Sequence, residues 1–524
     1  MGKNENLILV LDVGTGSGRA ILFDSRGKQV GLSQREWVHP RIEQHPGGFH
    51  FETSENWYLL KNCIHEVLAK PGIDVDNIAA VSSAAQRPGI VCYDAAGQEL
   101  CAWPCFDARA DGETEWIIEQ GYGPKIYEIN GDWPSIHEPA RLLWLKKNMP
   151  QIFDKVARIT MLDAWVLYKL TGQYVAEPTI ASFSGMFDIH RRDWSHEILD
   201  LLKLPAGILP PMANSASIMG QISGQASRET GLRQGIPVVL GGGDTQLALL
   251  GAGLATEGAG LVAGTFWVEG IIVDAPLIDT ARRKTRTFCH SLPDRWIIEA
   301  ANFSGILARW FRDVFAKQEV AQAAKKGASA YEMLNSIAQK VPPGSNGMQV
   351  CFSSLFDSGR WIHTSPAFMG WDVFDSENSD KAVFWRAILE NACYLAKGEF
   401  NLIRDVSGVP LKDVVFCGGA SKSSLWQQIL ADVLETTVLT PEVVETTSLG
   451  AAMCGAVGAG FYDDLKEASA AMSPPCQITE PNHKNAEIYD LEYRRWYEIC
   501  KHSLELVDKG VLDPMWAAPA TRER

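Results

Sequence analysis

The stretch LVLDVGTGSGRAILFDSRG, residues 9–27, constrains the fold more than any other part of the sequence. An apolar run ends at Asp12, and Gly14, Gly16 and Gly18 then alternate with other residues. A dinucleotide-binding fingerprint would space its glycines as Gly-x-Gly-x-x-Gly and would open a helix. Here an apolar, extended segment follows the glycines, and the turn residues DSRG close it. The sequence therefore predicts a glycine turn that joins two strands, as in a hairpin.

This glycine turn has two interpretations. Its backbone N–H groups, together with the hydroxyls of Thr15 and Ser17, can face phosphate oxygens, and Asp12 can hold a hydrated magnesium ion. A hairpin turn without any ligand fits the stretch equally well when it is considered alone. A P-loop is excluded, because the pattern Gly-x-x-x-x-Gly-Lys-[Ser/Thr] occurs nowhere in the chain.

A similar pattern recurs about half a chain length later. Residues 13–24 read VGTGSGRAILFD and residues 263–274 read AGTFWVEGIIVD, so that Gly-Thr is repeated at Gly264 and Thr265. An offset of this size is what a duplicated domain pair predicts. Two related domains that each present a Gly-Thr hairpin to a shared catalytic cleft describe two actin-like (ribonuclease H-like) ATPase domains. The predicted fold class is therefore α/β, with the function still to be argued from the site.

Length and patterning agree with two α/β domains. The 524 residues exceed the size at which a single core keeps growing. Strand-like and helix-like segments alternate along the chain, which indicates α/β layers. The strand-like segments are residues 78–83, 90–94, 238–240, 260–262, 270–273, 297–299 and 414–417. The helical patterns include residues 55–69, 140–147, 381–406 and 425–434.

The domain boundaries are predicted from turn residues. Three consecutive glycines at 241–243 follow a strand near mid-chain, so we expect an N-terminal domain over residues 1–246 and a C-terminal domain over 247–485. The prolines within residues 474–485 predict a linker into a final helix. Residues 486–524 would then form that helix and a tail, with the part after Pro514 loosely ordered.

Composition excludes several classes of function. The formal net charge is −15 and no Lys/Arg cluster stands out, which argues against a nucleic-acid partner. No apolar run reaches the ~18 residues of a membrane span. The first six residues lead directly into a strand-like segment and leave no room for a signal peptide. The eleven cysteines are scattered and odd in number, so we expect a reducing, cytoplasmic location.

Asp244 is the sharpest single candidate for catalysis. It follows a strand and the glycine turn, and it opens an apolar helical run. Glycines let ligand atoms approach the backbone closely. A carboxylate here could accept a proton from a substrate hydroxyl as that hydroxyl attacks a γ-phosphate. The alternative is an N-cap aspartate, which is common at this position.

Three other turns are weaker candidates for ligand contacts. Residues 418–424, GGASKSS, follow a strand and precede a helix, so their flexible backbone suits an adenine or α-phosphate contact. Residues 302–305, NFSG, stand before another helix. Gln86 and Arg87 lie between two apolar strands, where the planar guanidinium could bind substrate hydroxyls or carbonyls. Each of these also fits an ordinary turn.

Taken together, these stretches resemble the FGGY carbohydrate kinases, a family that includes glycerol and xylulose kinases, over nearly the whole chain. Asp12-x-Gly-Thr15 with Arg19 is similar to the family's first phosphate motif, and the Gly-Thr at 264–265 is similar to its second. Gly-Gly-Gly-Asp244 is similar to its catalytic-base motif. Segments 418–423, 425–426, 431–432 and 449–452 are similar to its C-terminal signature around the adenine.

The resemblance implies a role for each matching position, with ATP and Mg²⁺ as cofactors. Asp244 would be the general base, and Asp12 and Asp244 would lie near the magnesium ion. Gln86, Arg87, Asp244 and Thr245 would face the substrate. The implied ATP contacts are Thr15, Gly16, Ser17, Arg19, Gly264, Thr265, Gly305, Arg309, Gly419, Ala420 and Ser423.

Within the family, the likeness is greatest to its autoinducer-2 kinases. The supporting segments are DARA at 107–110, GTFW at 264–267, WFRD at 310–313, VPPGS at 341–345 and LVDKG at 506–510. One position departs from the pattern: Pro88 stands where glycerol kinases, and autoinducer-2 kinases as well, carry a Glu beside the Arg. Loss of that carboxylate removes an acceptor for polyol hydroxyls, so a different open-chain or keto-sugar substrate is an alternative.

The resemblance therefore predicts an ATP-dependent kinase that phosphorylates a primary hydroxyl of a small sugar or polyol-like molecule. Autoinducer-2 (dihydroxypentanedione) is the first expectation for the acceptor, and xylulose or another pentulose, glycerol and gluconate are alternatives. An actin-like switch protein, whose nucleotide state controls a protein partner, is an alternative of another class. A homodimer is the default expectation for the assembly.

Overall fold

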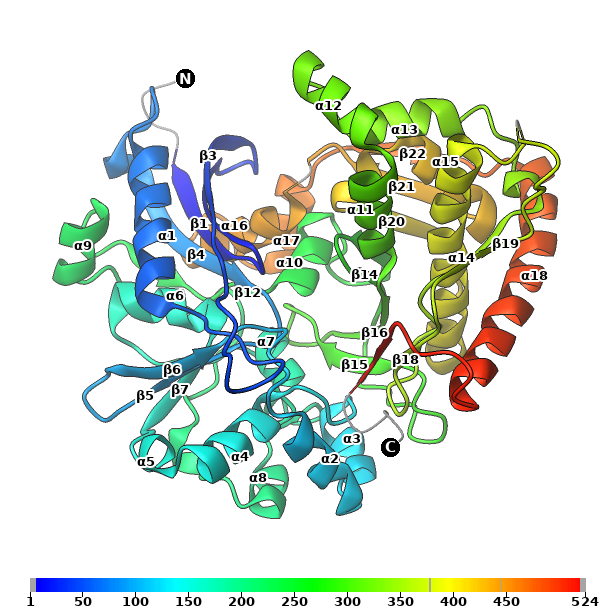
Figure 1. Ribbon diagram of the computed structural model, residues 1–524. Helices are drawn as coiled ribbons and strands as arrows, with labels where there is room; N and C mark the ends of the chain where they lie inside the picture. Colours follow the sequence, from blue (N-terminus) through cyan, green and yellow to red (C-terminus); the bar gives the residue numbers. More distant parts are fainter. Residues whose placement is uncertain (1–5, 377, 444, 519–524) are drawn as a thin grey trace.

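Two lobes make up the computed structural model, which describes residues 6–376, 378–443 and 445–518 (Figure 1). Each lobe contains a seven-stranded mixed sheet covered by helices. The first lobe is drawn in blue and cyan, and most of the second in green to red. This arrangement confirms the predicted α/β class.

The first sheet contains the glycine turn. Its strands are β1 (Leu7–Val13), β2 (Ser17–Asp24), β3 (Gln29–Glu36), β4 (Ile78–Ala85), β10 (Ile218–Gln221), β11 (Pro237–Val239) and β12 (Gly242–Gly243). They are ordered β10-β11-β4-β1-β2-β3, and β12 pairs with β4. β1, β2 and β3 form an antiparallel meander, with Asp12 opposite Arg19 in register. The predicted glycine hairpin is confirmed.

The second sheet repeats this hairpin. Its strands are β13 (Gly258–Ala263), β14 (Trp267–Val273), β15 (Arg286–Cys289), β16 (Trp296–Asn302), β20 (Asp413–Cys417), β21 (Thr437–Pro441) and β22 (Cys476–Thr479). They are ordered β15-β16-β14-β13-β20-β21-β22. β13 and β14 are antiparallel, and Gly264 and Thr265 lie in the turn between them. Both Gly-Thr segments therefore occupy equivalent places in their sheets.

Four small sheets, eighteen α-helices and five short 3-10 helices complete the secondary structure of the described residues. The short strands are β5 (Ile90–Tyr93), β6 (Glu99–Trp103), β7 (Arg158–Met161), β8 (Phe187–Asp188), β9 (Asp193–Trp194), β17 (Gln349–Cys351), β18 (Ile362–His363), β19 (Ala367–Met369) and β23 (Trp516–Ala517). The helices up to mid-chain are α1 (Thr53–Leu68), α2 (Asp111–Glu119), α3 (Gly123–Asn130), α4 (Glu138–Asn148), α5 (Pro150–Phe153), α6 (Leu162–Thr171), α7 (Pro178–Ala181), α8 (His196–Leu202), α9 (Gly224–Thr230) and α10 (Asp244–Gly251). The later helices are α11 (Ser304–Phe315), α12 (Lys317–Lys326), α13 (Ala330–Ala338), α14 (Lys381–Ser407), α15 (Ser424–Leu434), α16 (Thr446–Gly458), α17 (Leu465–Met472) and α18 (His483–Asp508).

Strand β1 is buried on both faces, which explains its unbroken apolar run. Leu9 and Leu11 belong to the core on the side of α1 and α6. Ile8 and Val10 point to the opposite face, where they join a core formed with α16. A helix from late in the chain therefore completes the first lobe, and Figure 1 shows α16 in orange beside β1 and β4.

Helices α10 and α16 cross with their backbones in contact. A Cβ added at Gly251 would lie 2.0 Å from the carbonyl oxygen of Thr446, and one at Gly450 would lie 2.0 Å from that of Leu247. Any side chain at either glycine would separate the helices. The two glycines therefore determine how closely residues at the start of α16 approach the start of α10.

Edge strand β15 of the second sheet is hydrogen-bonded to the first lobe. The Thr287 N–H donates to the Gly131 carbonyl at 2.9 Å, and the Cys289 N–H donates to Ser182 Oγ at 3.1 Å. These bonds occupy an edge that would otherwise leave backbone groups unpaired. They also bring Arg286, on the same strand, to the interface between the lobes.

Two predictions for the C-terminal part differ from the structure. Residues 474–485 were expected to form a linker, but they contain β22, which pairs with β21 and extends the second sheet. The segment after Pro514 was expected to be loosely ordered, but β23 pairs with β18. Residues 519–524 of that tail lie outside the described residues. Neither strand could be predicted from its local sequence. Prolines stand nearby, and the strand with which each one pairs is distant in sequence.

The boundaries 246/247 and 485/486 stay predictions, since α16 packs on the first sheet although it follows the proposed boundary. Of the described helices, none combines the length and the apolar character that crossing a membrane requires.

Gly450→Ala should destabilise the protein, because the added Cβ would meet the Leu247 carbonyl. We expect a loss of about 3 kcal/mol and a fall in melting temperature of about 5 °C, measured by differential scanning calorimetry. Gly112→Ala is the control, since no described heavy atom lies within 4 Å of its Cβ position. Equal melting temperatures for the two variants would contradict the close contact.

Candidate active site

The glycine turn before α10 is held against the first sheet by contacts that exclude side chains. A Cβ at Gly241 would lie 1.7 Å from the Ser83 carbonyl oxygen, and one at Gly242 would lie 2.4 Å from Thr179 Oγ1. The Gly243 N–H donates to the same Thr179 oxygen at 2.8 Å. These contacts position the residue that begins α10.

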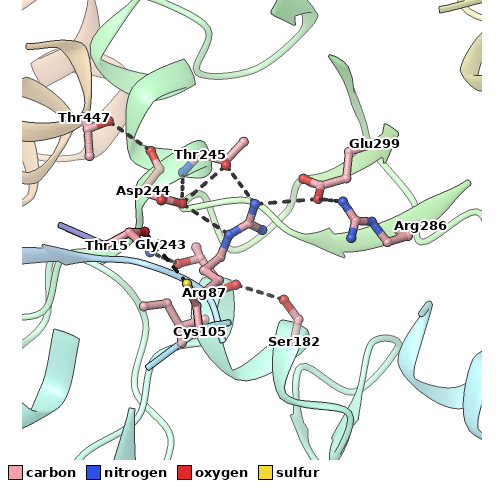
Figure 2. Close-up of polar contacts among 12 residues, drawn as sticks. Thr15, Arg87, Cys105, Ser182, Gly243, Asp244, Thr245, Arg286, Glu299 and Thr447 are labelled. Atoms are coloured by element: carbon pink, nitrogen blue, oxygen red, sulfur yellow. Dashed lines mark hydrogen bonds and ion pairs between the residues drawn. The ribbon is translucent and has the colours of Figure 1, made fainter. Parts of the chain in front are cut away.

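That residue is Asp244, whose carboxylate faces Arg87 (Figure 2). Its Oδ1 accepts from the Thr245 N–H at 2.7 Å and lies 3.4 Å from Arg87 Nε. The helix cap is Gly243, so the N-cap interpretation of Asp244 is wrong. The side chain keeps 47 % of its surface exposed, which leaves the carboxylate open to a ligand. Partial desolvation by the surrounding protein atoms raises the pKa of Asp244, and the charge of Asp12 raises it further, while Arg87 and Thr245 lower it.

Arg87 is buried between groups from both lobes. Its Nη2 donates to Thr245 Oγ1 at 2.7 Å and lies 3.6 Å from Glu299 Oε1 on β16. The guanidinium carbon lies 4.7 Å from the centre of the Phe183 ring. Glu299 also accepts from Arg286 Nη2 at 3.0 Å. Figure 2 shows Arg87 between Asp244 and Glu299.

Asp12 lies at the end of β1 and is 2 % exposed. Arg19, opposite it in the hairpin, forms ion pairs with both Asp12 and Glu445. Ser448 Oγ on α16 donates to Asp12 Oδ2 at 3.4 Å. Burial is the main cause that raises the pKa of Asp12; Arg19 lowers it and Glu445 raises it. The guanidinium of Arg19 is therefore occupied by two carboxylates, and its predicted contact with ATP stays a prediction.

The first Gly-Thr turn is exposed at its tip. Thr15 and Gly16 are exposed and Ser17 is half-buried. The Thr15 Oγ1 lies 3.8 Å from Cys105 Sγ, and the Gly16 carbonyl accepts from the Trp37 N–H. The tip of this turn, at Thr15 and Gly16, is therefore open to a ligand from the solvent side.

Gln86 is buried and supports this turn through hydrogen bonds to the backbone. It is 2 % exposed, and its Nε2 donates to the Gly14 carbonyl at 3.3 Å. Its Oε1 accepts from the Cys105 N–H at 3.4 Å. Both ends of the amide therefore bind backbone, which favours a supporting role, and its predicted contact with substrate stays a prediction.

The second Gly-Thr turn is packed against two other predicted segments. A Cβ at Gly305 would lie 2.0 Å from the Gly264 carbonyl oxygen, and one at Gly418 would lie 2.6 Å from that of Ala263. Gly264 and Thr265 are themselves exposed. The structure thus brings the 264–265 turn, the start of α11 and the 418–424 segment together, as the sequence predicts.

The remaining predicted ATP residues differ in their surroundings. Gly419 is exposed with open space at its Cβ position, and Ala420 is half-buried. Ser423 caps α15, and its Oγ also accepts from Asn335 Nδ2 at 2.9 Å. Arg309 is exposed on α11. Ser423 therefore has a structural function, and a contact with nucleotide stays a prediction for all four.

Sequence reasoning missed several residues of this cluster. Glu299 stands in an otherwise apolar strand, and a charged residue inside a buried strand is itself a sequence signal for a paired or functional site. Glu177, the N-cap of α7, accepts from the Thr179 hydroxyl that also holds Gly243, and the Pro that follows Glu177 is the sequence signal for this cap. Glu445 and Ser448 carried no signal, because their partners Arg19 and Asp12 are distant in sequence.

The two carboxylates of the site, Asp12 and Asp244, fit Mg²⁺ bound together with substrate better than a metal ion bound by protein side chains alone. Asp12 is close enough to Asp244 that its charge raises the pKa of Asp244. Within residues 6–376, 378–443 and 445–518, no three His, Cys, Asp or Glu side chains converge to hold a metal. Two carboxylates without a third ligand match the way Mg²⁺ binds beside substrate phosphates.

Two cavities lie outside this cluster. One, of about 370 Å³, is lined by Arg191, Arg192, Asp193, Met212, Ala213, Asn214 and Pro293. The second, about 250 Å³, lies between α18 and residues 354–362. Neither contains a predicted site residue, so the site is defined by the convergence of side chains.

Comparisons with known proteins agree with these features. A family model described as "FGGY family of carbohydrate kinases, N-terminal domain" matches residues 7–251, and the model of the C-terminal domain matches residues 262–459. An autoinducer-2 kinase from Enterobacter sp. (strain 638) is 36% identical over 518 residues, which cover 98% of this chain and 97% of that protein. An autoinducer-2 kinase from Klebsiella pneumoniae is 36% identical over 523 residues, covering 99% and 98%.

Solved structures share the fold at lower identity. Ligand-bound xylulose kinase from Lactobacillus acidophilus has a TM-score of 0.83 at 21% identity and covers 96% of this chain and 100% of its own. Plasmodium falciparum glycerol kinase with ADP has a TM-score of 0.81 at 18% identity, covering 95% and 98%. These likenesses confirm the predicted fold of two actin-like ATPase domains.

Thr179→Val should lower turnover, because it removes the acceptor of the Gly243 N–H and so loosens the turn that carries Asp244. We expect a fall in kcat of about 10- to 100-fold and a loss of stability of about 2 kcal/mol. Thr230→Val is the matched control, since Thr230 is also fully buried and donates to Ala226 at 2.7 Å. A control that loses as much turnover would contradict the positioning role.

Asp163, buried at the start of α6, gives a second prediction. Burial, with the nearby charge of Glu177, raises the pKa of Asp163 to about 8. The folded protein then holds a proton between about pH 4 and 8 that the unfolded chain releases, so stability falls as the pH rises through this range. Asp163→Asn should remove this loss, and its melting temperature should rise above the wild-type value increasingly from pH 5 to 8.

The control for this titration is Asp200→Asn, which changes an exposed carboxylate on α8. It should keep the wild-type dependence of melting temperature on pH. A difference between Asp163→Asn and wild type that stays constant from pH 5 to 8 would show that the Asp163 carboxyl is not the titrating group.

Proposed function

Because this chain belongs to the FGGY family of carbohydrate kinases, we propose that it transfers the γ-phosphate of ATP to a primary hydroxyl of autoinducer-2 (dihydroxypentanedione). The chain is a sugar kinase, a phosphotransferase. The observation that carries the choice of acceptor is full-length similarity to proteins named autoinducer-2 kinase, at 34–36% identity.

Asp244 acts as the general base. Its carboxylate is open to a ligand at the start of α10, and it takes the proton from the substrate hydroxyl as the oxygen attacks phosphorus. The raised pKa of Asp244 supports this role, because a base whose conjugate acid is less acidic accepts a proton more readily. Arg87 Nη2 and Thr245 lie beside it and would orient the substrate oxygens.

The two Gly-Thr turns bind the triphosphate. Their exposed N–H and hydroxyl groups, at Thr15 in one lobe and Thr265 in the other, would receive the phosphate oxygens. Gly305, Gly419 and Ala420 would flank the nucleotide. Closure of the lobes would bring hydroxyl and γ-phosphate in line and expel water, which limits ATP hydrolysis.

Magnesium would be held at Asp12 and Asp244, where it would neutralise charge on the phosphates. Arg19 pairs with Asp12 and so keeps that carboxylate in place. The guanidinium favours the ionised form of Asp12 that a metal ligand needs, because it opposes the rise in pKa that burial causes.

Other acceptors of the same family are the alternatives. Xylulose, gluconate and glycerol kinases share the fold at 18–21% identity, which says nothing about the acceptor of this chain. Pro88 removes a carboxylate beside Arg87 that glycerol kinases and autoinducer-2 kinases both carry, so a different open-chain or keto-sugar acceptor is a further alternative. An actin-like switch protein is not proposed, because the chain belongs to a family of kinases. A homodimer and a cytoplasmic location stay predictions.

Asp244→Asn should lower turnover by about 10²–10⁴-fold, the range expected for loss of a general base. The wild type is assayed with ATP, Mg²⁺ and a panel of dihydroxypentanedione, pentuloses, pentitols, glycerol and gluconate, with mass detection of the phosphorylated product. Dihydroxypentanedione should give the highest kcat/KM.

Asp94→Asn is the control for that variant, since Asp94 accepts from backbone N–H groups in an exposed turn of the same lobe. It should keep wild-type turnover. The role of Asp244 is refuted if its variant stays within about threefold of wild type. A pentulose or glycerol preferred over dihydroxypentanedione would replace the proposed acceptor and leave the kinase assignment intact.

A further inference from the structure

Four charged side chains of alternating sign run from the second lobe to Asp244 (Figure 2). Arg286 Nη2 lies 3.0 Å from Glu299 Oε1, Arg87 Nη2 lies 3.6 Å from the same oxygen, and Arg87 Nε lies 3.4 Å from Asp244 Oδ1. The two arginines and two carboxylates balance in charge. This row crosses from β15 and β16 of the second sheet to the end of β4 in the first.

Three members of the row are buried, and this makes their pairing costly to disturb. Glu299 is 0 % exposed, and the side chains of Arg87 and Arg286 are 6 % and 7 % exposed. A buried charge without a partner loses several kcal/mol of hydration that nothing replaces. Glu299 therefore needs both guanidinium groups, and each guanidinium is held by it.

Arg286 is fixed more firmly than Arg87. It stands directly opposite Glu299 in the β15–β16 register, so the two form a cross-strand pair. Its guanidinium carbon also lies within 4.7 to 5.6 Å of the centres of the Phe356, Trp361, Phe183 and Phe288 rings. The Arg286–Glu299 pair is thus a rigid part of the second sheet.

Arg87 has weaker restraints. Its guanidinium donates a hydrogen bond to Thr245 Oγ1 at 2.7 Å, and its Nη1 has no hydrogen-bond partner among the described residues. Two carboxylates, Asp244 and Glu299, attract it from opposite sides. Without Glu299, the guanidinium would be drawn fully to Asp244 and would occupy the carboxylate.

We propose that Glu299, held by Arg286, is a positioning residue that keeps the Arg87 guanidinium between the lobes, where it binds the acceptor without closing onto Asp244. This inference rests on the proposed function, in which Arg87 contacts the acceptor. In this arrangement a residue of the second lobe, which holds the nucleotide, also contributes to the binding of the acceptor. The same strand ends at Asn302, whose Oδ1 accepts from the Ser304 N–H beside the second Gly-Thr turn.

The test separates acceptor binding from nucleotide binding. In Glu299→Gln the acceptor KM, measured with dihydroxypentanedione, should rise by about tenfold, while the KM for ATP stays within about twofold. Glu299→Asp keeps the charge and should recover part of the acceptor KM. In the Arg87→Lys background, adding Glu299→Gln should change the acceptor KM by less than about threefold, because the two act as a unit.

A matched control removes a different buried charge. Glu390 is 1 % exposed and pairs with Arg386 at 2.8 Å within α14. Glu390→Gln should lower the melting temperature without changing the acceptor KM. If Glu299→Gln does not fold, Arg286→Lys replaces it and should also raise the acceptor KM alone.

Three results would count against the proposal. Glu299→Gln could raise the KM values for acceptor and ATP equally, or it could change the acceptor KM no more than Glu390→Gln does. Its effect on the acceptor KM could also add fully to that of Arg87→Lys. Each of these results overturns the positioning role and leaves the proposed function standing. A wild type that phosphorylates no acceptor of the panel overturns the proposed function, and the inference fails with it. A selective rise in the acceptor KM that Glu299→Asp reverses supports the proposal.

Discussion

The contact between the backbones of α10 and α16 is the constraint on which the rest of the site depends. Gly251 and Gly450 leave no room for side chains, so the two helices meet along their backbones. The start of α16 is thereby carried to the end of β1, where Ser448 meets Asp12. Thr447 on the same helix donates to the Asp244 carbonyl at 3.3 Å. Residues from both ends of the chain converge because two glycines permit it.

The ion pairs around the two carboxylates then determine the chemistry of the site. Each carboxylate of the site has a guanidinium beside it: Arg19 beside Asp12, and Arg87 beside Asp244. Burial raises the pKa of both carboxyl groups, and the arginines limit that rise. The pairs differ in one respect that matters for chemistry. Asp12 is 2 % exposed and tightly paired, whereas the Asp244 side chain keeps 47 % of its surface open. Asp12 therefore suits a fixed metal ligand, and Asp244 suits a general base.

Local sequence patterns were sufficient for the elements and for the two turns. The apolar run before Asp12, and its counterpart before Gly264, predicted both hairpins, because a strand buried on both faces must be apolar throughout. Pairings between distant segments were not predictable in this way. Glu299 shows no pattern that names Arg87 as its neighbour, since their contact depends on how two separate sheets face each other. The strand β22 was hidden for the same reason, as its partner lies beyond a whole helical segment.

The placement of α16 has a consequence for how the protein is made. The first lobe's sheet is complete in sequence by Gly243, yet the face that bears Ile8 and Val10 packs in a core with residues of α10, of α17 and, at residues 446–458, of α16. A ribosome must translate most of the second lobe before that helix emerges. The nascent first lobe therefore carries an uncovered apolar surface through much of synthesis, and such surfaces are what chaperones bind. The first lobe therefore completes its folding only after most of the second lobe has been synthesised.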